Sequence, residues 1–215
     1  MPKTKARISI SLDGYMAGPN QSEANPLGEG GEELHEWAFR QANFRAMHGL
    51  GEGGETGVSN DIVGESVADL GAVVMGRNMF GPIRGDWPDE EWQGWWGDDP
   101  PFHCPVYVLT HHARDPFELE GGNSFHFVTT GIETAIAEAK EAADDRDVTV
   151  GGGASTLQQA IAAGLLDEIL VTQVPVLLGA GERLFDHLAA AAAQVDLVDV
   201  VEDAELLHIT YRLHR

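Results

Sequence analysis

A strand, a glycine-rich turn and the first turn of a helix follow one another within one stretch, Val148-Thr149-Val150-Gly151-Gly152-Gly153-Ala154-Ser155-Thr156-Leu157. Because the three glycines lack a Cβ atom, their backbone can lie flush against a ligand. The N–H groups that open the following helix have no intrahelical acceptor, and a helix N-terminus favours an anion. The stretch therefore predicts a site for the diphosphate of a nucleotide. The alternative is a glycine turn that binds nothing.

The composition is that of one globular domain. The 215 residues, 43% of them hydrophobic, suffice for a core, and we expect a single domain over residues 1–215. No apolar run reaches the roughly 20 residues of a membrane span, and residues 1–7 lead into a strand rather than an apolar signal core. Because Cys104 is the single cysteine, no internal disulfide can form, and we expect a cytoplasmic protein.

The surface is strongly acidic, with a net charge of −22 from 35 acidic and 13 basic residues. Such a surface repels nucleic acid and anionic membranes, so neither is expected as a partner. It also repels an anionic ligand, so local cations and helix N-termini would have to overcome the global field. Adaptation to high salt, where screening removes the self-repulsion, is a hypothesis for this charge.

Strand and helix patterns alternate up to Leu166, and strands follow with little helix between them. We expect strands at 7–12, 72–75, 105–110, 125–128 and 148–150, and then at 168–174, 195–201 and 206–213. Helices are expected over 32–47, from a cap at Ser59 or Asn60 to Leu70, from a capping box at 130–133 to 143, and after the glycines to about 163. The pattern predicts an α/β body with an antiparallel C-terminal part.

The glycines fit neither of the two common nucleotide-binding motifs. A dinucleotide fingerprint lies in the first strand–helix turn, with an acidic residue about 20 positions further on, whereas Gly151 follows several strands. A P-loop contains Gly-Lys followed by Ser or Thr, which is missing from this sequence.

Four segments occur in an order that points to another family: Ser11-Leu12-Asp13-Gly14-Tyr15-Met16-Ala17-Gly18, Val74-Met75-Gly76-Arg77-Asn78-Met79-Phe80, Val106-Tyr107-Val108-Leu109-Thr110-His111 and Gly151-Gly152-Gly153. Over about residues 6–190 the chain resembles the dihydrofolate-reductase-like superfamily, in particular the C-terminal reductase domain of the riboflavin-biosynthesis deaminase/reductase, RibD. The resemblance implies an α/β fold with a mixed, largely parallel central sheet flanked by helices and antiparallel C-terminal strands. It also implies NADPH as the cofactor.

The resemblance places the cofactor contacts at the ends of strands. Gly76 and Arg77 would lie against the phosphates, where a guanidinium makes a charge-assisted contact, and a surface ion pair is the alternative for Arg77. The other implied contacts are Met16 and Ala17 over the nicotinamide, Leu109, Thr110 and His111 at the adenosine and its 2′-phosphate, Arg114 as a cationic helper, and Gly151, Gly152, Gly153, Ala154, Ser155 and Thr156 at the diphosphate and the nicotinamide.

Two positions depart from the family pattern. The family usually has Thr or Ser two residues after the arginine, where this chain has Met79, so one hydroxyl contact to a phosphate is missing. The riboflavin reductases often have an acidic residue directly before the glycines, where this chain has Val150, which counts against the riboflavin intermediate as substrate. No zinc-deaminase signature is present, so the resemblance implies a stand-alone reductase domain.

Asp13 and Glu36 are the candidate catalytic carboxylates. Asp13 follows the first strand, at the carboxyl end where open α/β sheets bind ligands, and a turn residue before Gly14 is the alternative. Glu36 lies in the region that resembles the first helix of the folate reductases, which supplies their substrate carboxylate. Glu33 and His35 are alternatives in this register, and a solvated helix face is the alternative for all three.

Four of the five tryptophans fall within residues 85–99, among acidic residues. We favour packing or a subunit interface, and with it a homodimer, over a lid on a planar substrate. The adjacent pairs at 103–104 and 111–112 have poor geometry for a chelate, so no metal is expected.

The sequence thus predicts an NADPH-dependent reductase. It would transfer a hydride to a C=N or C=O carbon of a small heterocyclic or sugar-linked substrate, such as the ribosylamino-pyrimidine of riboflavin synthesis or a pterin. The alternative is a module that binds NADP or a related nucleotide without turnover.

Overall fold

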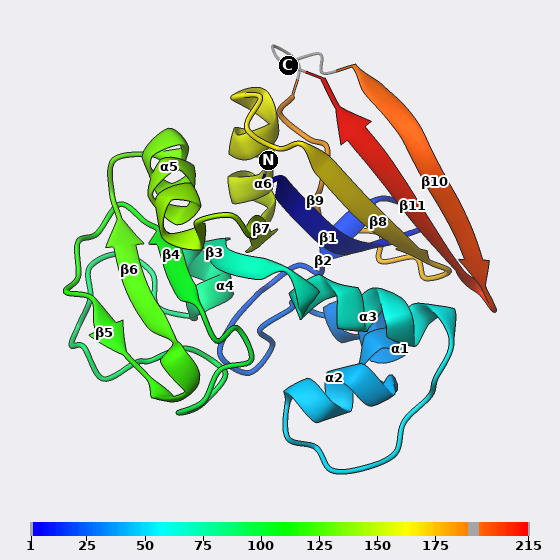
Figure 1. Ribbon diagram of the computed structural model, residues 1–215, viewed down its shortest axis with the longest axis horizontal. Helices are drawn as coiled ribbons and strands as arrows, with labels where there is room; N and C mark the ends of the chain where they lie inside the picture. Colours follow the sequence, from blue (N-terminus) through cyan, green and yellow to red (C-terminus); the bar gives the residue numbers. More distant parts are fainter. Residues whose placement is uncertain (1, 189–193, 215) are drawn as a thin grey trace.

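A computed structural model describes residues 2–188 and 194–214 (Figure 1). The alanine run 189–193, the low-complexity segment of the sequence, lies outside the described residues.

One large sheet forms the centre of the described chain, with the strand order β10-β11-β8-β1-β7-β3-β4-β6-β5. Its strands are β1 (Thr4–Ser11), β3 (Leu70–Gly76), β4 (Pro105–Leu109), β5 (Phe117–Glu118), β6 (Ser124–Val128), β7 (Asp147–Gly152), β8 (Glu168–Val174), β10 (Val195–Asp203) and β11 (Leu206–Leu213). The pairs from β8 to β6 are parallel, and β5, β11 and β10 each pair antiparallel with a neighbour. The predicted fold class, including the antiparallel C-terminal strands, is confirmed.

Helices cover both faces of this sheet. They are α1 (Glu36–Phe39), α2 (Ala42–Met47), α3 (Val58–Ala68), α4 (Arg77–Phe80), α5 (Ile132–Ala143) and α6 (Ala154–Ala162), with 3-10 turns η1 (Gly31–Leu34) and η2 (Glu120–Gly122). The strands β2 (Tyr15–Ala17) and β9 (Glu182–Arg183) form a small separate ribbon. In Figure 1, α5 and α6 lie close to each other, whereas α1, α2 and α3 gather elsewhere as a group of their own.

The burial pattern of the central strands decides which face each helix covers. Ala6 and Ile8 of β1 pack with Val148 of β7 and with the apolar faces of α5 and α6. The residues next to them in β1 point to the opposite face, because side chains alternate along a strand. On that opposite face, Trp37 of α1 and Val63 of α3 form a separate cluster.

The predicted helix over 32–47 is broken into η1, α1 and α2, so that prediction was wrong. Gln41 has an extended backbone (φ −73°, ψ 142°), and it bridges to Glu55 in the following loop. Its side-chain amide donates to the carbonyl of Trp37 at 2.8 Å. The backbone amide of Ala42 donates to the carbonyl of Glu55 at 2.9 Å, so a hydrogen bond to the loop replaces a helical one at this point.

Two predicted caps were also wrong, because glycines precede both helices. Gly57 is the residue before α3, and Ser59 and Asn60 lie inside its first turn. The Ser59 hydroxyl donates to Asp203 instead of capping the helix. Gly131 precedes α5 without any side-chain cap, so the capping box at 130–133 does not form.

Candidate functional site

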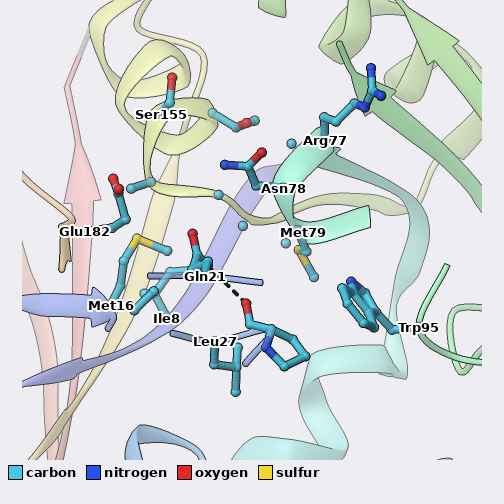
Figure 2. A pocket seen from close by; sticks show the side chains of 18 of the residues that line it. Ile8, Met16, Gln21, Leu27, Arg77, Asn78, Met79, Trp95, Ser155 and Glu182 are labelled. Carbon is cyan, nitrogen blue, oxygen red and sulfur yellow. Dashed lines mark hydrogen bonds between the residues drawn. The ribbon is translucent and has the colours of Figure 1, made fainter. Parts of the chain in front are cut away.

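A cavity of about 960 Å³ opens where β3, β4 and β7 end, and it extends towards α1, α2 and α3. This is the edge at which parallel sheets bind ligands, at the carboxyl ends of their strands. Most of the predicted cofactor residues line the cavity. They are Met16, Ala17, Gly76, Arg77, Leu109, Thr110, His111, Gly151, Gly152, Gly153, Ala154, Ser155 and Thr156. Figure 2 shows the cavity between Ser155 and Asn78 on one side and Met16, Ile8 and Leu27 on another.

The three glycines form the end of β7 and the turn into α6. Val150 pairs with Val74 and Gly152 pairs with Met75, so Gly151 is an extra residue in a bulge. Gly152 and Gly153 have φ angles of +152° and +75°, which residues with a Cβ atom rarely adopt. The bulge and the two glycines direct the chain into α6, whose first residues Ala154, Ser155 and Thr156 line the cavity. The amides of Thr156 and Leu157 donate to the carbonyl of Gly153, so the helical hydrogen bonds begin after Ser155.

Gly76, at the end of β3, allows this turn to approach. A Cβ at position 76 would lie only 2.5 Å from Oγ1 of Thr156 and 3.5 Å from the carbonyl oxygen of Gly152. The φ of Gly76 is −78°, an ordinary value for any residue, so the close approach and not the backbone conformation requires glycine here. We call Gly76 and Gly151–Gly153 together the glycine cradle.

Met79 covers part of the glycine cradle. Its Cε would lie 3.3 Å from a Cβ at Gly151, and its Sδ would lie 3.1 Å from a Cβ at Gly152. The family pattern has a hydroxyl at this position, and here a flexible apolar side chain fills the space beside the glycines.

Arg77 lies at the rim of the cavity and leans against an aromatic ring. Its guanidinium carbon is 3.4 Å from the ring centre of Trp87, and Nη1 donates to the Thr110 hydroxyl at 3.3 Å. Its Nε and Nη2 groups are buried and find no hydrogen-bond partner among the described residues. Burial, followed by the neighbouring cations Arg84 and Arg114, lowers the pKa of Arg77.

The rim is therefore a local concentration of positive charge on an acidic protein. Arg84, His111 and His112 line the cavity beside Arg77. Asp86 offsets part of the charge of Arg77, and its carboxylate also lies 2.8 Å from Nδ1 of His112. Unpartnered guanidinium N–H groups are costly when buried, and an anion at the rim could satisfy them.

Arg114, in contrast, does not line the cavity. Its two terminal nitrogens donate to the carbonyls of Trp92 (2.6 Å) and Glu90 (2.7 Å). The guanidinium also lies 5.1 Å from the ring centre of Trp87. These contacts hold the tryptophan-rich segment against the rest of the chain. Arg114, predicted to assist cofactor binding, therefore stabilises this segment.

The tryptophan-rich segment packs within its own chain. Trp87 contacts Phe80 and Phe127, and the indole N–H of Trp92 donates to the carbonyl of Phe80 at 3.0 Å. Trp95 and Trp96 also line the cavity, and Figure 2 shows Trp95 on its Met79 side. The segment thus packs on the sheet and forms one wall of the cavity at the same time.

The far end of the cavity is lined by aromatic and histidine side chains from α1 and α2. Phe44 stacks on His48 with ring centres 4.1 Å apart, and Phe39 lies 5.1 Å from Phe44. Burial lowers the pKa of His35 to about 4, so its imidazole is neutral at pH 7. We call His35, Trp37, Phe39, Phe44 and His48 the aromatic end of the cavity; apart from His35, the sequence analysis did not assign them to a site.

The two predicted catalytic carboxylates lie outside the cavity. Asp13 accepts hydrogen bonds from the Ser11 hydroxyl (2.6 Å) and from the amides of Leu178 (3.1 Å) and Gly179 (2.7 Å). It therefore fixes the loop after β8, a contact that the sequence analysis did not predict. Glu36 is exposed on α1 and does not line the cavity, because its neighbours His35 and Trp37 occupy the inward-facing positions.

Within the described residues, no three His, Cys, Asp or Glu side chains are grouped closely enough to hold a metal ion. No helix in the same ranges is long and apolar enough to span a membrane.

Solved structures with the same fold include several reductases. A protein assigned to riboflavin biosynthesis from Shewanella sp. PV-4 is 22% identical, with 99% of each chain covered and a TM-score of 0.62. Dihydrofolate reductase from Enterococcus faecalis, complexed with NADP(H) and RAB-propyl, is 14% identical, with 99% of this chain and 97% of that chain covered and a TM-score of 0.54. At these identities the likeness concerns the fold alone.

A bifunctional protein from Thermotoga maritima, a diaminohydroxyphosphoribosylaminopyrimidine deaminase/5-amino-6-(5-phosphoribosylamino)uracil reductase, is 14% identical, with a TM-score of 0.56. The match covers 99% of this chain but 57% of the Thermotoga chain. No curated protein matches the sequence at a significant level.

A family model gives the assignment itself. The model described as the RibD C-terminal domain matches residues 2–209, almost the whole chain. The protein therefore belongs to the RibD C-terminal domain family.

Proposed function

We propose that this protein is a reductase that binds NADPH along the carboxyl edge of the sheet. The observation that carries the proposal is the glycine cradle next to a cationic rim, at the mouth of a cavity of about 960 Å³. Membership of the RibD C-terminal domain family supports the same activity.

The residues of the cradle fit a dinucleotide. Gly152 and Gly153 line the cavity with backbone that has no side chain. The first amides of α6 can donate hydrogen bonds to the oxygens of a diphosphate. At the rim, the unpartnered N–H groups of Arg77 suit a further phosphate, such as the 2′-phosphate that distinguishes NADPH from NADH. Bound NADPH would supply a hydride to the substrate.

The substrate would occupy the aromatic end. Planar side chains such as Trp37 and Phe44 suit a small ring, so we propose a C=N or C=O carbon of a heterocyclic or sugar-linked compound as the hydride acceptor. A ribosylamino-uracil, as in the reaction named for the Thermotoga protein, and a pterin are the specific candidates. Among the described residues, Glu182 is the acidic side chain that lines the cavity.

A second candidate is a module that holds the nucleotide without turnover. The positions of Asp13 and Glu36 favour it, since both predicted carboxylates lie outside the cavity. The two candidates share the cofactor site and differ in whether bound NADPH is oxidised when a ring substrate is added.

Titration with NADPH and with NADH, followed by quenching of tryptophan fluorescence, tests the shared part. Trp95 and Trp96 line the cavity, so a bound nicotinamide dinucleotide should quench them. We expect micromolar binding of NADPH and weaker binding of NADH. Equal affinities would contradict the role of the rim, and no binding of either would overturn the proposal.

Arg77→Ala should weaken NADPH binding by about 1.5–3 kcal/mol, the range for a hydrogen bond to a charged group. The loss should shrink for NADH, which has no 2′-phosphate. Arg40→Ala is the matched control, because Arg40 is exposed, pairs with Glu55 and does not line the cavity. If both variants weaken binding equally, the effect comes from the net charge and not from the rim.

A further inference from the structure

At one edge of the large sheet, an apolar surface lies open to solvent. The strands β8, β11 and β10 follow one another towards this edge, and β10 is the edge strand. Figure 1 shows β10 at the outer margin of the molecule. Two rows of directly paired residues cross the three strands, Ile169-Tyr211-Leu197 and Val171-Ile209-Val200.

Both rows become more exposed towards the edge. On β8, Ile169 and Val171 are buried in the core beneath α5 and α6. On β10, Leu197 and Val200 are 61% and 49% exposed. Five of the ten large hydrophobic side chains that are exposed among the described residues lie on β10 and β11. Single exposed apolar side chains are ordinary, whereas a cluster of them indicates a contact surface.

The apolar residues of the two outer strands share one face of the sheet. We call them the β10–β11 face: Val195, Leu197, Val200, Leu207, Ile209 and Tyr211. Tyr211 packs on the core beneath α6, so the face continues that core outwards. The helices α5 and α6 themselves lie over the central strands and leave β10 uncovered.

This face is nearly free of charge on a strongly acidic chain. Side chains alternate along a strand, so Asp196, Asp199 and Asp203 project from the opposite face of β10. Among the residues of β10 and β11, all of which the structure describes, Glu202 is the one charged residue on the β10–β11 face. Two chains with a net charge of −22 each repel one another where carboxylates meet, and this face avoids most of that repulsion.

The open edge of β10, in contrast, is protected against pairing with another strand. The register with β11 shifts between Leu197 and Asp199, which marks a bulge. The amide of Val200 donates to the carboxylate of Asp199 at 2.9 Å, so this amide already has an acceptor. Bulges and charged side chains on an edge strand discourage the addition of a further strand. A partner would therefore pack on the face and not extend the sheet.

We propose that the β10–β11 face is the contact surface of a two-fold symmetric homodimer. A partner that approaches this acidic chain needs an apolar face that is equally free of carboxylates, and a second copy brings the same face. Two sheet faces pack about 10 Å apart with interdigitated side chains. With the two-fold axis across the strands, near Leu197 and Val200, the two Glu202 carboxylates lie at opposite ends of the contact.

The proposal moves the interface away from the tryptophan-rich segment. That segment was expected to form a subunit contact, but Trp87 and Trp92 are engaged within their own chain. The β10–β11 face has no such engagement on its outer half.

Sedimentation velocity over a range of micromolar concentrations, in dilute buffer and in molar KCl, tests the association. We expect a monomer–dimer equilibrium that is tighter in KCl, because salt screens the repulsion between two acidic chains. Looser association in KCl would mean that ion pairs hold the dimer, and it would overturn the proposal. A monomer under all conditions, or a mass that grows beyond two chains, would also overturn it, because a two-fold contact is closed.

Leu197→Lys and Leu197→Glu test the face itself. They place a charge in the middle of the contact and change the net charge in opposite directions. Because Leu197 is exposed in the single chain, both variants should fold, which circular dichroism would show. We expect both to raise the dissociation constant of the dimer at least about 30-fold, since each charge would be buried without a partner. If Leu197→Lys keeps the dimer while Leu197→Glu loses it, net charge decides the association and the proposal is wrong.

Leu50→Lys is the matched control. Leu50 is 51% exposed and follows α2, which packs on α3 on the opposite side of the sheet. The dissociation constant of the dimer should therefore stay unchanged in this variant. A loss equal to that of Leu197→Lys would show that the contact does not lie on the β10–β11 face.

Discussion

The two ends of the cavity are built in different ways. The glycine cradle consists of backbone at the ends of regular strands, held by the close approach of Gly76 and Thr156. The aromatic end consists of side chains on and next to α1 and α2, two of the three short pieces that replace one predicted helix. Its shape depends on loop contacts such as the bridge from Gln41 to Glu55.

This difference fits the proposed function, in which the cofactor binds at the glycine cradle and the substrate at the aromatic end. A cofactor shared by a family needs the same phosphate and backbone contacts in every member, and regular strand ends provide them. A substrate that differs between members is better met by irregular connections, which tolerate change. We therefore expect changes at the glycine cradle to affect NADPH binding, and changes at the aromatic end to affect substrate binding and the pH dependence of stability.

His35 should give the largest effect at the aromatic end. Its pKa is about 4 in the folded protein, against about 6.5 in the unfolded chain. Above pH 6.5 the imidazole is neutral in both states. As the pH falls from 6.5 towards 4, the unfolded chain binds the proton more readily, so the folded state loses up to about 3 kcal/mol. Urea unfolding at pH 7 and pH 4.5 should show this loss.

His35→Gln removes the titrating group and should flatten this part of the stability profile. NADPH affinity at pH 7 should stay unchanged, since His35 belongs to the aromatic end. If the variant loses as much stability as the unchanged protein between pH 7 and pH 4.5, other groups cause the pH dependence.

Gly76→Ala should destabilise the glycine cradle by about 1–3 kcal/mol, the usual range for overpacking. The new Cβ would lie 2.5 Å from Oγ1 of Thr156, whose side chain is 4% exposed and has little room to move. Thermal unfolding and NADPH titration would both report the change.

Thr156→Ala provides the matched rescue. With Oγ1 removed, the remaining distance from a Cβ at position 76 to the Thr156 Cβ is 3.6 Å, an ordinary contact. The double variant should therefore recover most of the stability that Gly76→Ala loses. If it does not, the close approach is not the reason for glycine at this position.

The sequence predicted the glycine cradle well because strand, glycines and helix are adjacent in the chain. The predicted strand 148–150 lies within β7, which continues through Gly151 and Gly152, and α6 begins at Ala154, as the pattern indicated. The prediction for β8 and β11 also matches, since no glycine or proline interrupts either strand.

The aromatic end could not be predicted in the same way, because its contacts join residues that are distant in sequence. The pattern of Trp37 and Phe44 fits one helix. Backbone hydrogen bonds with the loop residue Glu55 break it, from the Ala42 amide to the Glu55 carbonyl (2.9 Å) and from the Glu55 amide to the Arg40 carbonyl (2.8 Å). Arg114 was assigned to the cofactor by charge alone, and the carbonyls that hold it belong to a segment with no regular structure. The buried contact between Thr172 of β8 and His208 of β11 likewise joins residues 36 positions apart in the sequence.

Glycine content alone does not distinguish a binding turn from a flexible link. We expect the smallest change in stability from an insertion in the loop at 49–57. A Cβ added at Gly51 or Gly53 would meet no atom within 4 Å, unlike one added at the glycines of the cradle. Insertion of Gly-Ser after Gly51 should change the stability by less than about 0.6 kcal/mol, because loop-closure entropy grows slowly with length. The same insertion after Gly152 should abolish NADPH binding, since it would separate β7 from α6. Equal tolerance at both places would mean that the cradle, like the loop, is only a connection.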